Sequence, residues 1–339
     1  MKRVLITGAT GYIGSHTIVE LVNAGYNVVG VDNFSNSSAK VLDGIEKILG
    51  KRIDFEQVDC TDYNAFAKVF EKYNDIEAAI HFAASKAVGE SVTMPLLYYR
   101  NNIGSLLNLI DLMTNKGKGA NIVFSSSCTV YGQPTKENLP IAESAPLQPA
   151  TSPYGRTKQM AEEILQDCVR AYSNLNATAL RYFNPIGAHP TAFIGELPNG
   201  VPQNLVPFVT QTAAGIRECL SVFGDDYNTP DGSCIRDYIY VVDLAKAHVK
   251  AVDRLLEKGE RWNIFNLGTG RGLSVLELVN AFMKATGVKV NYKIVGRREG
   301  DIEQVWADPK KANSELGWSA DTPIEDVLAS AWKWQSSLK

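Results

Sequence analysis

The sequence predicts an α/β fold, in which a doubly wound parallel sheet of the Rossmann type is joined to a smaller α/β domain. Apolar segments of strand length alternate with helical patterns through the first half of the chain. A glycine-rich turn joins the first strand to the first helix. The segment 190–207 is rich in Pro, Gly and Asn, which indicates a new layer. We expect one domain over 1–186 and about 236–270, and a second over about 187–235 and 271–339.

The individual elements follow from runs of apolar residues and from amphipathic periods. The strands expected in the large sheet cover 3–7, 27–31, 53–58, 78–82, 121–124, 177–182 and 263–268. The helices expected around that sheet follow the glycine turn up to about residue 25 and cover 63–72, 95–115, 153–173 and 243–257. In the smaller domain we expect a strand over 219–223 and helices over 205–216, 274–286, 309–316 and 324–335.

The first strand, turn, helix and second strand predict a dinucleotide-binding unit. Gly8, Gly11 and Gly14 have the spacing G-x-x-G-x-x-G, and the helix that follows can offer free N–H groups to a pyrophosphate. Asp32 ends the second strand, eighteen residues after Gly14. A carboxylate there accepts hydrogen bonds from the adenosine ribose and repels an additional phosphate. We therefore predict that the cofactor is NAD rather than NADP.

A second motif predicts acid–base chemistry. Tyr154 and Lys158 are four residues apart, which places them on one face of a helix that Ser152 can cap. A lysine cation one turn away favours the phenolate and lowers the pKa of the tyrosine. Residues 125–127 are three serines at the end of a strand, where their hydroxyls can bind a substrate oxygen. The combination predicts a base that takes a proton from an alcohol.

Composition narrows the possible partners and the compartment. The chain has 339 residues and a net charge of −3, which does not favour a nucleic-acid partner. The apolar run 4–6 is too short for a signal peptide or a membrane span. Five scattered cysteines without a CxxC pair indicate reduced thiols, so we expect a cytoplasmic protein. Four scattered histidines do not suggest a metal site.

Together these motifs resemble the extended short-chain dehydrogenase/reductase superfamily, and within it the UDP-glucose (UDP-galactose) 4-epimerase family. The similarity covers essentially the whole chain. The segments that carry it are 11–16, 32–33, 81–91, 126–132, 154–158, 181–184, 236–238 and 298–301. The resemblance implies an isomerase that inverts carbon 4 of a UDP-hexose through a 4-keto sugar and bound NAD.

The resemblance also implies a role for individual residues. Ser127 and Tyr154 would lie at the 4-hydroxyl of the sugar, and Lys158 would bind the nicotinamide ribose. The NAD contacts would be Gly8, Gly11, Tyr12, Ile13, Gly14, Asp32, Asn33, Asp59, Cys60, Phe82, Ala83, Lys86, Asn101, Tyr154, Lys158 and Phe183. The UDP-sugar contacts would be Ser127, Asn184, Asn204, Leu205, Ser221, Phe223, Arg236, Tyr238, Arg298, Asp301 and Val305. Two arginines far apart in sequence suit a diphosphate, and Phe223 offers a ring face to uracil.

One position departs from the pattern of some relatives, which carry a bulky tyrosine where this chain has Val305. Valine leaves more room beside the 2-substituent of the sugar, so we expect activity on N-acetylated UDP-hexoses as well. The alternative is that Val305 only fills a gap in the core. As is common in relatives, the helices near 95–115 and 153–173 are expected to pair across a homodimer.

Three other functions are compatible with parts of the pattern. A nucleotide-sugar 4,6-dehydratase needs an Asp-Glu pair after the serine site, where this chain has Cys128 and Thr129. A UDP-glucuronate epimerase or decarboxylase remains open. A non-catalytic NAD-sensing protein typically lacks the tyrosine, which is present here as Tyr154.

Overall fold

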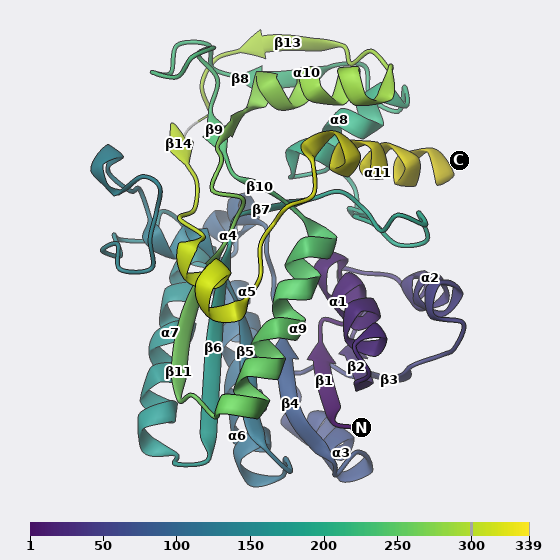
Figure 1. The fold of residues 1–339 in the computed structure, drawn as a ribbon, viewed down its shortest axis with the longest axis vertical. Helices are drawn as coiled ribbons and strands as arrows, with labels where there is room; N and C mark the ends of the chain where they lie inside the picture. The colour runs from purple at the N-terminus through teal and green to yellow at the C-terminus, as the bar shows by residue number, and fades with distance from the viewer. Residues whose placement is uncertain (299–300, 339) are drawn as a thin grey trace.

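The computed structural model describes residues 1–298 and 301–338. Its centre is a parallel sheet of seven strands in the order β11-β6-β5-β4-β1-β2-β3 (Figure 1). The strands are β1 (Arg3–Thr7), β2 (Asn27–Asp32), β3 (Asp54–Gln57), β4 (Ile76–His81), β5 (Ala120–Ser127), β6 (Leu175–Tyr182) and β11 (Trp262–Leu267). The order reverses at β1, as in doubly wound sheets. The predicted fold class is confirmed, including the return of the late strand β11 to the edge of the large sheet.

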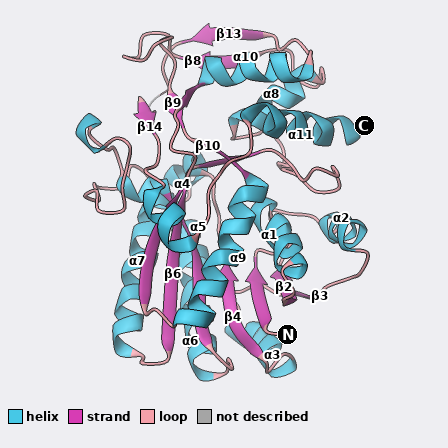
Figure 2. Ribbon diagram, viewed as in Figure 1, coloured by secondary structure: helices cyan, strands magenta, loops and turns pink. Residues whose placement is uncertain are grey.

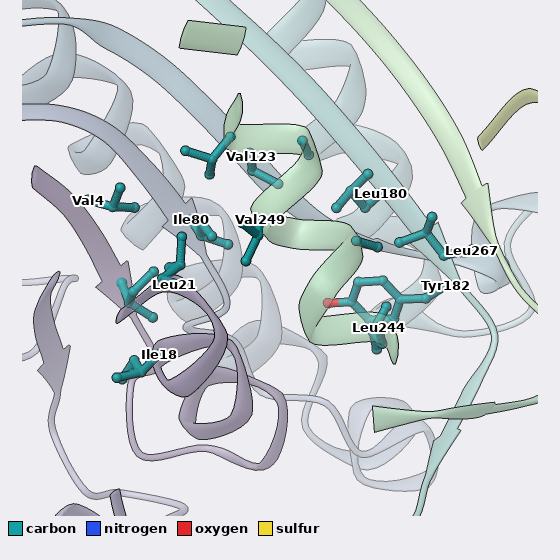
Figure 3. Packing of buried hydrophobic residues seen from close by; sticks show 14 of the residues in the cluster. Val4, Ile18, Leu21, Ile80, Val123, Leu180, Tyr182, Leu244, Val249 and Leu267 are labelled. Atoms are coloured by element: carbon teal, nitrogen blue, oxygen red, sulfur yellow. The ribbon is translucent and has the colours of Figure 1, made fainter. Parts of the chain in front are cut away.

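Helices cover both faces of this sheet (Figure 2). One face packs against α1 (Tyr12–Asn23), α2 (Lys40–Leu49) and α9 (Val241–Lys258), and the other against α3 (Tyr63–Lys72), α6 (Gly104–Asn115) and α7 (Pro153–Ala171). Figure 3 shows the first core, where Leu21, Leu244 and Val249 meet Ile80 and Leu180 of the strands. The inner strands β1, β2, β4, β5 and β6 are covered on both faces and contain continuous apolar runs, which is why the sequence revealed them, whereas the edge strand β3 is polar and largely exposed.

The structure differs from the prediction most around residues 88–115. A helix expected over 95–115 consists of α5 (Pro95–Tyr98), the π-helical turn η1 (Tyr99–Ile103) and α6, and α4 (Val88–Thr93) precedes it. The widened turn contains Asn101 and Asn102, whose amides donate to the Oγ and the carbonyl of Ser85 respectively. Helix α2 was not predicted.

The serine run lies at the end of a strand, as the sequence predicts, although the strand expected over 121–124 extends through the run as β5. Ser125, Ser126 and Ser127 pair in register with the last three residues of β6, Leu180 to Tyr182. Polar residues at a strand end do not carry the apolar signal by which the strand was recognised. The run is therefore held by the sheet and not by a flexible turn.

A smaller layer lies beyond the carboxyl ends of the large sheet (Figure 1). It contains α8 (Leu205–Ala213), α10 (Val275–Thr286) and α11 (Ile324–Ser337), which share a core with β8 (Leu220–Phe223) and β10 (Tyr238–Tyr240). β8 pairs with β13 (Tyr292–Val295), β10 with β7 (Asn184–Ile186), and β9 (Ile235–Arg236) with β12 (Leu273–Ser274) and β14 (Gln304–Val305). The short turns η2 (Cys128–Tyr131), η3 (Lys136–Asn138) and η4 (Ala312–Leu316) complete the described elements.

The late segment that contains η4 packs on the larger sheet: Ala312, Leu316 and Trp318 belong to the core formed by α1 and α9. Within the described residues, no helix is long and apolar enough to cross a bilayer.

Candidate active site

Tyr154 and Lys158 lie on the first two turns of α7, beside the carboxyl end of β5. The helix begins as the sequence predicts: the Oγ of Ser152 accepts a hydrogen bond from the N–H of Gly155 at 3.1 Å, and Pro153 occupies the first turn. Because the cap fixes where α7 begins, it also fixes which residues face the strand end.

The three residues expected to be catalytic come together at this point. Lys158 is 3% exposed, and its Nζ donates to the carbonyl oxygen of Ser125 at 2.6 Å. The same Nζ lies 5.8 Å from the ring centroid of Tyr154. The Oγ of Ser127 accepts hydrogen bonds from the N–H and the Oγ1 of Thr129 at 3.2 and 3.0 Å. A hydroxyl, a phenol and an ammonium group therefore share one polar site at the end of β5.

The predicted lowering of the tyrosine pKa is wrong for the chain alone. Burial raises the pKa of Tyr154 to about 12, although hydrogen bonding with Ser127 acts in the opposite direction. Burial also lowers the pKa of Lys158 to about 8, and the Glu162 carboxylate partly compensates. The ammonium group donates to a carbonyl oxygen instead of the phenol oxygen, so removal of water outweighs the expected attraction.

The glycine turn packs so closely against neighbouring backbone that it leaves no room for side chains at two of its positions. Gly8 has φ 69°, and a Cβ atom there would lie 2.8 Å from the N atom of Ala83. A Cβ atom on Gly14 would lie 2.2 Å from the carbonyl oxygen of Gly8. Gly11 is the N-cap of α1 and supplies no side chain to the free N–H groups of the first turn. These N–H groups fit a pyrophosphate, so the turn fits the cofactor that the sequence predicts.

Acidic and amide side chains surround the expected adenosine end. Asp32 ends β2 and accepts hydrogen bonds from the N–H groups of Thr10 and Phe34 at 3.0 and 2.9 Å. Asn33 donates from Nδ2 to Asp59 at 3.0 Å. Burial raises the pKa of Asp59, but hydrogen bonds from Thr61 and Asn33 lower it by more, so the net pKa of Asp59 is below the usual value. Asp59 is thus an ionised acceptor after β3, and the Asp32 carboxylate lies at the end of the neighbouring strand β2.

The remaining expected cofactor residues line the same edge of the sheet. Cys60 is buried next to Asp59, Phe82 and Ala83 follow β4, and Phe183 follows β6. Tyr12 and Ile13 open α1, and the hydroxyl of Tyr12 donates to the carbonyl oxygen of Gly187 at 2.6 Å. Tyr12 therefore ties the glycine-rich helix to the segment that leads into the smaller layer.

Glu196 connects the two expected ligand sites and was missed by the sequence analysis. Its Oε1 accepts a hydrogen bond from Nδ2 of Asn204 at 2.6 Å and lies 3.6 Å from Nζ of Lys86. Lys86 was expected to bind the cofactor and Asn204 the UDP-sugar. Glu196 stands 110 positions from Lys86, and no motif marks it, so the sequence held no signal for this contact.

The expected diphosphate residues form a cluster in the smaller layer. Asp301 accepts hydrogen bonds from Arg298 at 2.6–3.2 Å and lies 3.8 Å from Nη2 of Arg236. The guanidinium of Arg298 lies 5.4 Å from the centroid of the Phe223 ring, which is 39% exposed. The structure thus brings two cations and an exposed aromatic face together. Glu299 and Gly300, which belong to the motif used for the resemblance, lie outside the described residues.

Strand pairing places the other substrate residues around this cluster. Arg236 pairs with Val305 across β9 and β14, and Tyr238 pairs with Asn184 across β10 and β7. Val305 is 5% exposed and packs in one core with Phe183, Tyr131 and Ile141. Two further expected contacts lie on neighbouring elements: Leu205 opens α8, and Ser221 lies on β8.

Asp237 organises this region and was not singled out in the sequence. It is fully buried, and its carboxylate accepts hydrogen bonds from the N–H groups of Thr269 and Ala307 at 2.9 and 3.1 Å. Because Asp237 stands between Arg236 and Tyr238, these bonds fix both of them relative to the end of β11. In the part of the chain that is described, no group of His, Cys, Asp and Glu side chains could hold a metal ion.

Comparison with known proteins shows the same whole-chain similarity. Residues 5–331 match the GDP-mannose 4,6 dehydratase family. The chain is 52% identical over 334 residues to the UDP-glucose 4-epimerase of Dictyostelium discoideum, and the match covers 98% of this chain and 96% of that protein. It is 53% identical over 334 residues to the UDP-glucose 4-epimerase of Bacillus subtilis, covering 98% and 97%.

Solved structures agree with this match. A UDP-glucose 4-epimerase from Stenotrophomonas maltophila with bound NAD and formylated UDP-arabinopyranose has a TM-score of 0.96 and 46% identity, covering 100% of this chain and 99% of that one. A UDP-glucose 4-epimerase from Bifidobacterium longum in complex with NAD+ and UDP has a TM-score of 0.94 and 46% identity, covering 99% and 98%.

Proposed function

The chain belongs to the UDP-glucose 4-epimerase family, and from this membership and the geometry of the site we propose that it reversibly inverts carbon 4 of UDP-hexoses. The observation that carries the proposal is the position of Ser127, Tyr154 and Lys158. Ser127 ends β5, and Tyr154 and Lys158 lie beside it on α7. The same chain has a glycine turn that fits a dinucleotide and a pair of arginines suited to a diphosphate. The substrates of the proposed reaction are UDP-glucose and UDP-galactose.

The chain's own residues supply position and proton transfer. When bound, NAD supplies a reversible hydride acceptor, which makes the inversion an oxidation at carbon 4 followed by a reduction. Tyr154 takes the proton of the 4-hydroxyl, directly or through Ser127, and returns it after the sugar has turned. The Nζ of Lys158 can bind the nicotinamide ribose while the backbone of Ser125 holds it in place. The cofactor would be bound by the glycine turn, Asp32, Asn33, Asp59 and the other residues named for it above.

Anchoring through UDP explains how the sugar can present both faces. Arg236 and Arg298 would hold the diphosphate through charge-assisted hydrogen bonds, and Phe223 would stack on the uracil ring. These groups bind the part of the substrate that does not react. The 4-keto sugar can therefore swing about its link to the diphosphate without leaving the site.

The elimination chemistry of a 4,6-dehydratase is disfavoured at this site. The place of the acidic pair is taken by Cys128 and Thr129. Burial raises the pKa of the Cys128 thiol to about 12, so the thiol is a poor acid at neutral pH. The two other candidate functions differ from the proposed one in what they convert. A UDP-glucuronate epimerase or decarboxylase would act on UDP-glucuronate instead of a UDP-hexose. A non-catalytic NAD-sensing protein would convert no UDP-hexose.

A single incubation separates these functions. Purified protein is mixed with UDP-galactose, UDP-N-acetylgalactosamine or UDP-glucuronate without added NAD, and the products are separated by chromatography. We expect UDP-glucose from UDP-galactose. Conversion of the N-acetylated sugar to its C4 epimer would support the role predicted for Val305, and its absence would favour the alternative that Val305, which packs with Phe183, Tyr131 and Ile141, only fills the core. If only UDP-glucuronate were converted, the protein would be a UDP-glucuronate epimerase or decarboxylase. If NAD were bound and no sugar were converted, the result would favour a non-catalytic NAD-sensing protein.

We also propose a cytoplasmic homodimer. All five cysteines lie within the described residues and are free thiols, which suits a reducing compartment. Val92, Leu96 and Leu107, on α4, α5 and α6, are 62%, 64% and 48% exposed. Apolar side chains gathered on adjoining helices suit a second copy of the chain. Light scattering should give twice the mass of the chain, and Leu96→Glu should give the mass of one.

A further inference from the structure

A buried ion pair lies beneath the serine run and has no part in the mechanism above. Glu162 on α7 and Arg181 on β6 are each 2% exposed. The Nε and Nη2 of Arg181 donate to the two carboxylate oxygens of Glu162 at 2.9 and 2.5 Å. The Nη1 of Arg181 donates to the hydroxyl of Tyr131 at 2.9 Å, and that hydroxyl donates to Asn266 at 2.7 Å. Burying two charges is costly even when they are fully hydrogen-bonded, so a role in the adjoining site would explain their place.

Glu162 is directly bonded to the segment that carries the catalytic serine. The Oγ of Ser126 donates to Oε1 of Glu162. The residue before Ser126 holds Nζ of Lys158 through its carbonyl oxygen, and the residue after it is Ser127. The carboxylate therefore holds the middle of a three-residue segment whose two ends serve the reaction. Arg181, through its two bonds to Glu162, fixes the orientation of that carboxylate.

The spacing on α7 adds an electrostatic connection. Tyr154, Lys158 and Glu162 follow one another at intervals of four residues, so they form one stripe on the helix. The negative charge of Glu162 raises the pKa of Lys158 against the lowering by burial. From β4, the buried His81 faces the same ammonium group, and burial lowers the pKa of that histidine to about 3, so it is neutral. Glu162 is thus the group that favours the charged form of Lys158.

The ionisable groups on β6 do not favour the charged form of Lys158 as Glu162 does. Tyr182 is bonded through its hydroxyl to Ser125, and burial raises the pKa of that phenol far above neutrality, so it carries no charge. Arg181 is a cation paired with Glu162, and of these two charges the one that acts on the pKa of Lys158 is that of Glu162. On α7, Tyr154 also remains protonated near pH 7 because burial raises its pKa to about 12.

We propose that Glu162, oriented by Arg181, is a positioning residue that keeps Lys158 charged and holds the serine run in place during the reaction. This inference rests on the proposed epimerase function. The two can fail separately: if the unmodified protein converts no UDP-hexose, the function is wrong, whereas an active enzyme whose variants keep the original pH profile contradicts only the role of Glu162.

The test is the pH profile of kcat for Glu162→Gln, measured on the holoenzyme with UDP-galactose between pH 6 and 10. Loss of the carboxylate should move the alkaline limb to lower pH by about one unit, which is roughly a tenfold loss of kcat on that limb. Glu162→Asp keeps the charge and should return the limb toward its original position. A purely structural role would lower kcat by the same factor at every pH, or would lower only the melting temperature.

A second variant covers the case in which Glu162→Gln does not fold because Arg181 is left unpaired. The double variant Glu162→Gln with Arg181→Met removes both charges and keeps similar side-chain volumes. Its alkaline limb should also move to lower pH. The matched control is Glu260→Gln, which removes one partner of the buried Arg254 far along the chain from α7 and should leave the profile in place. An unshifted limb in the folded Glu162 variants would overturn the proposal.

Discussion

Replacing Lys158 by methionine should make the folded protein more stable at neutral pH while abolishing turnover. The Lys158 side chain is almost fully buried, and burial lowers its pKa from 10.5 to about 8. A shift of that size corresponds to about 3 kcal/mol of unfavourable free energy for the charged, folded form. Methionine has a similar length and no charge. Against this gain stands the lost bond to the carbonyl oxygen of Ser125, whose cost we put at about 1–3 kcal/mol.

The pH dependence of the unfolding free energy separates the effect of the Lys158 charge from the effect of changed packing in Lys158→Met. Below pH 8 the lysine is charged in both the folded and the unfolded chain, and the full cost of burying the charge applies. Between pH 8 and 10.5 the folded state releases its proton first, so the stability of the unmodified protein rises with pH. The difference in unfolding free energy between Lys158→Met and the unmodified protein should therefore change by about 3 kcal/mol, in favour of the unmodified protein, from pH 7 to pH 10.5.

The assay is urea unfolding of nucleotide-free protein at both pH values, with intrinsic fluorescence as the signal. Groups that the two proteins share cancel in the comparison. Lys250→Met, which replaces an exposed lysine on α9, is the control and should show no such dependence. If the difference in unfolding free energy between Lys158→Met and the unmodified protein is the same at pH 7 and at pH 10.5, burial of the charged ammonium does not carry the expected free-energy cost, and the reasoning fails.

Three further substitutions test separate parts of the site. Tyr154→Phe should keep NAD bound, as measured by cofactor release on denaturation, and should lose nearly all turnover; activity near the unmodified level would remove the base from the mechanism. Gly14→Ala should lower cofactor content at least tenfold because the new Cβ would lie 2.2 Å from the oxygen of Gly8, whereas Gly89→Ala meets nothing within 4 Å and should keep it. Val305→Tyr should reduce turnover of UDP-N-acetylglucosamine far more than that of UDP-galactose, and an unmodified protein without any activity on the N-acetylated sugar would contradict the assigned role.

The parts of the fold that the sequence predicted are those with strong local signals. The inner strands of the large sheet are apolar on both faces, and α7 begins at Ser152 and Pro153, whose capping roles are local. The segment 95–115 was harder because its π-helical turn is held by side-chain bonds from Asn101 and Asn102 to Ser85, a contact between distant positions. Strand β13 is mostly exposed and pairs with β8 over seventy residues away, so its own sequence gives a weak signal.

The site residues that the sequence predicted are likewise those with a local sequence pattern, and those it missed depend on tertiary contacts. Asp32 was found because its place after a strand is a local pattern. Glu196 was not found because its contacts to Lys86 and Asn204 exist only once the two layers meet. The error over the pKa of Tyr154 has the same origin: the distance to Lys158 along the helix was right, but the amount of water that tertiary packing removes from the phenol outweighs it.

This correction bears on how the proton moves. With a pKa of about 12, only about one phenol in 10⁵ is ionised at pH 7, so in the chain alone Tyr154 is suited to give a proton rather than to take one. A reversible inversion requires both steps, since the proton taken from the 4-hydroxyl must return to the 4-keto oxygen. The chain holds the phenol protonated and the ammonium of Lys158 charged, which is the arrangement needed for the returning step. The outward step needs the phenolate, and the charge that favours it must come from the loaded site together with Lys158, because the described side chains around Tyr154 do not by themselves overcome its burial.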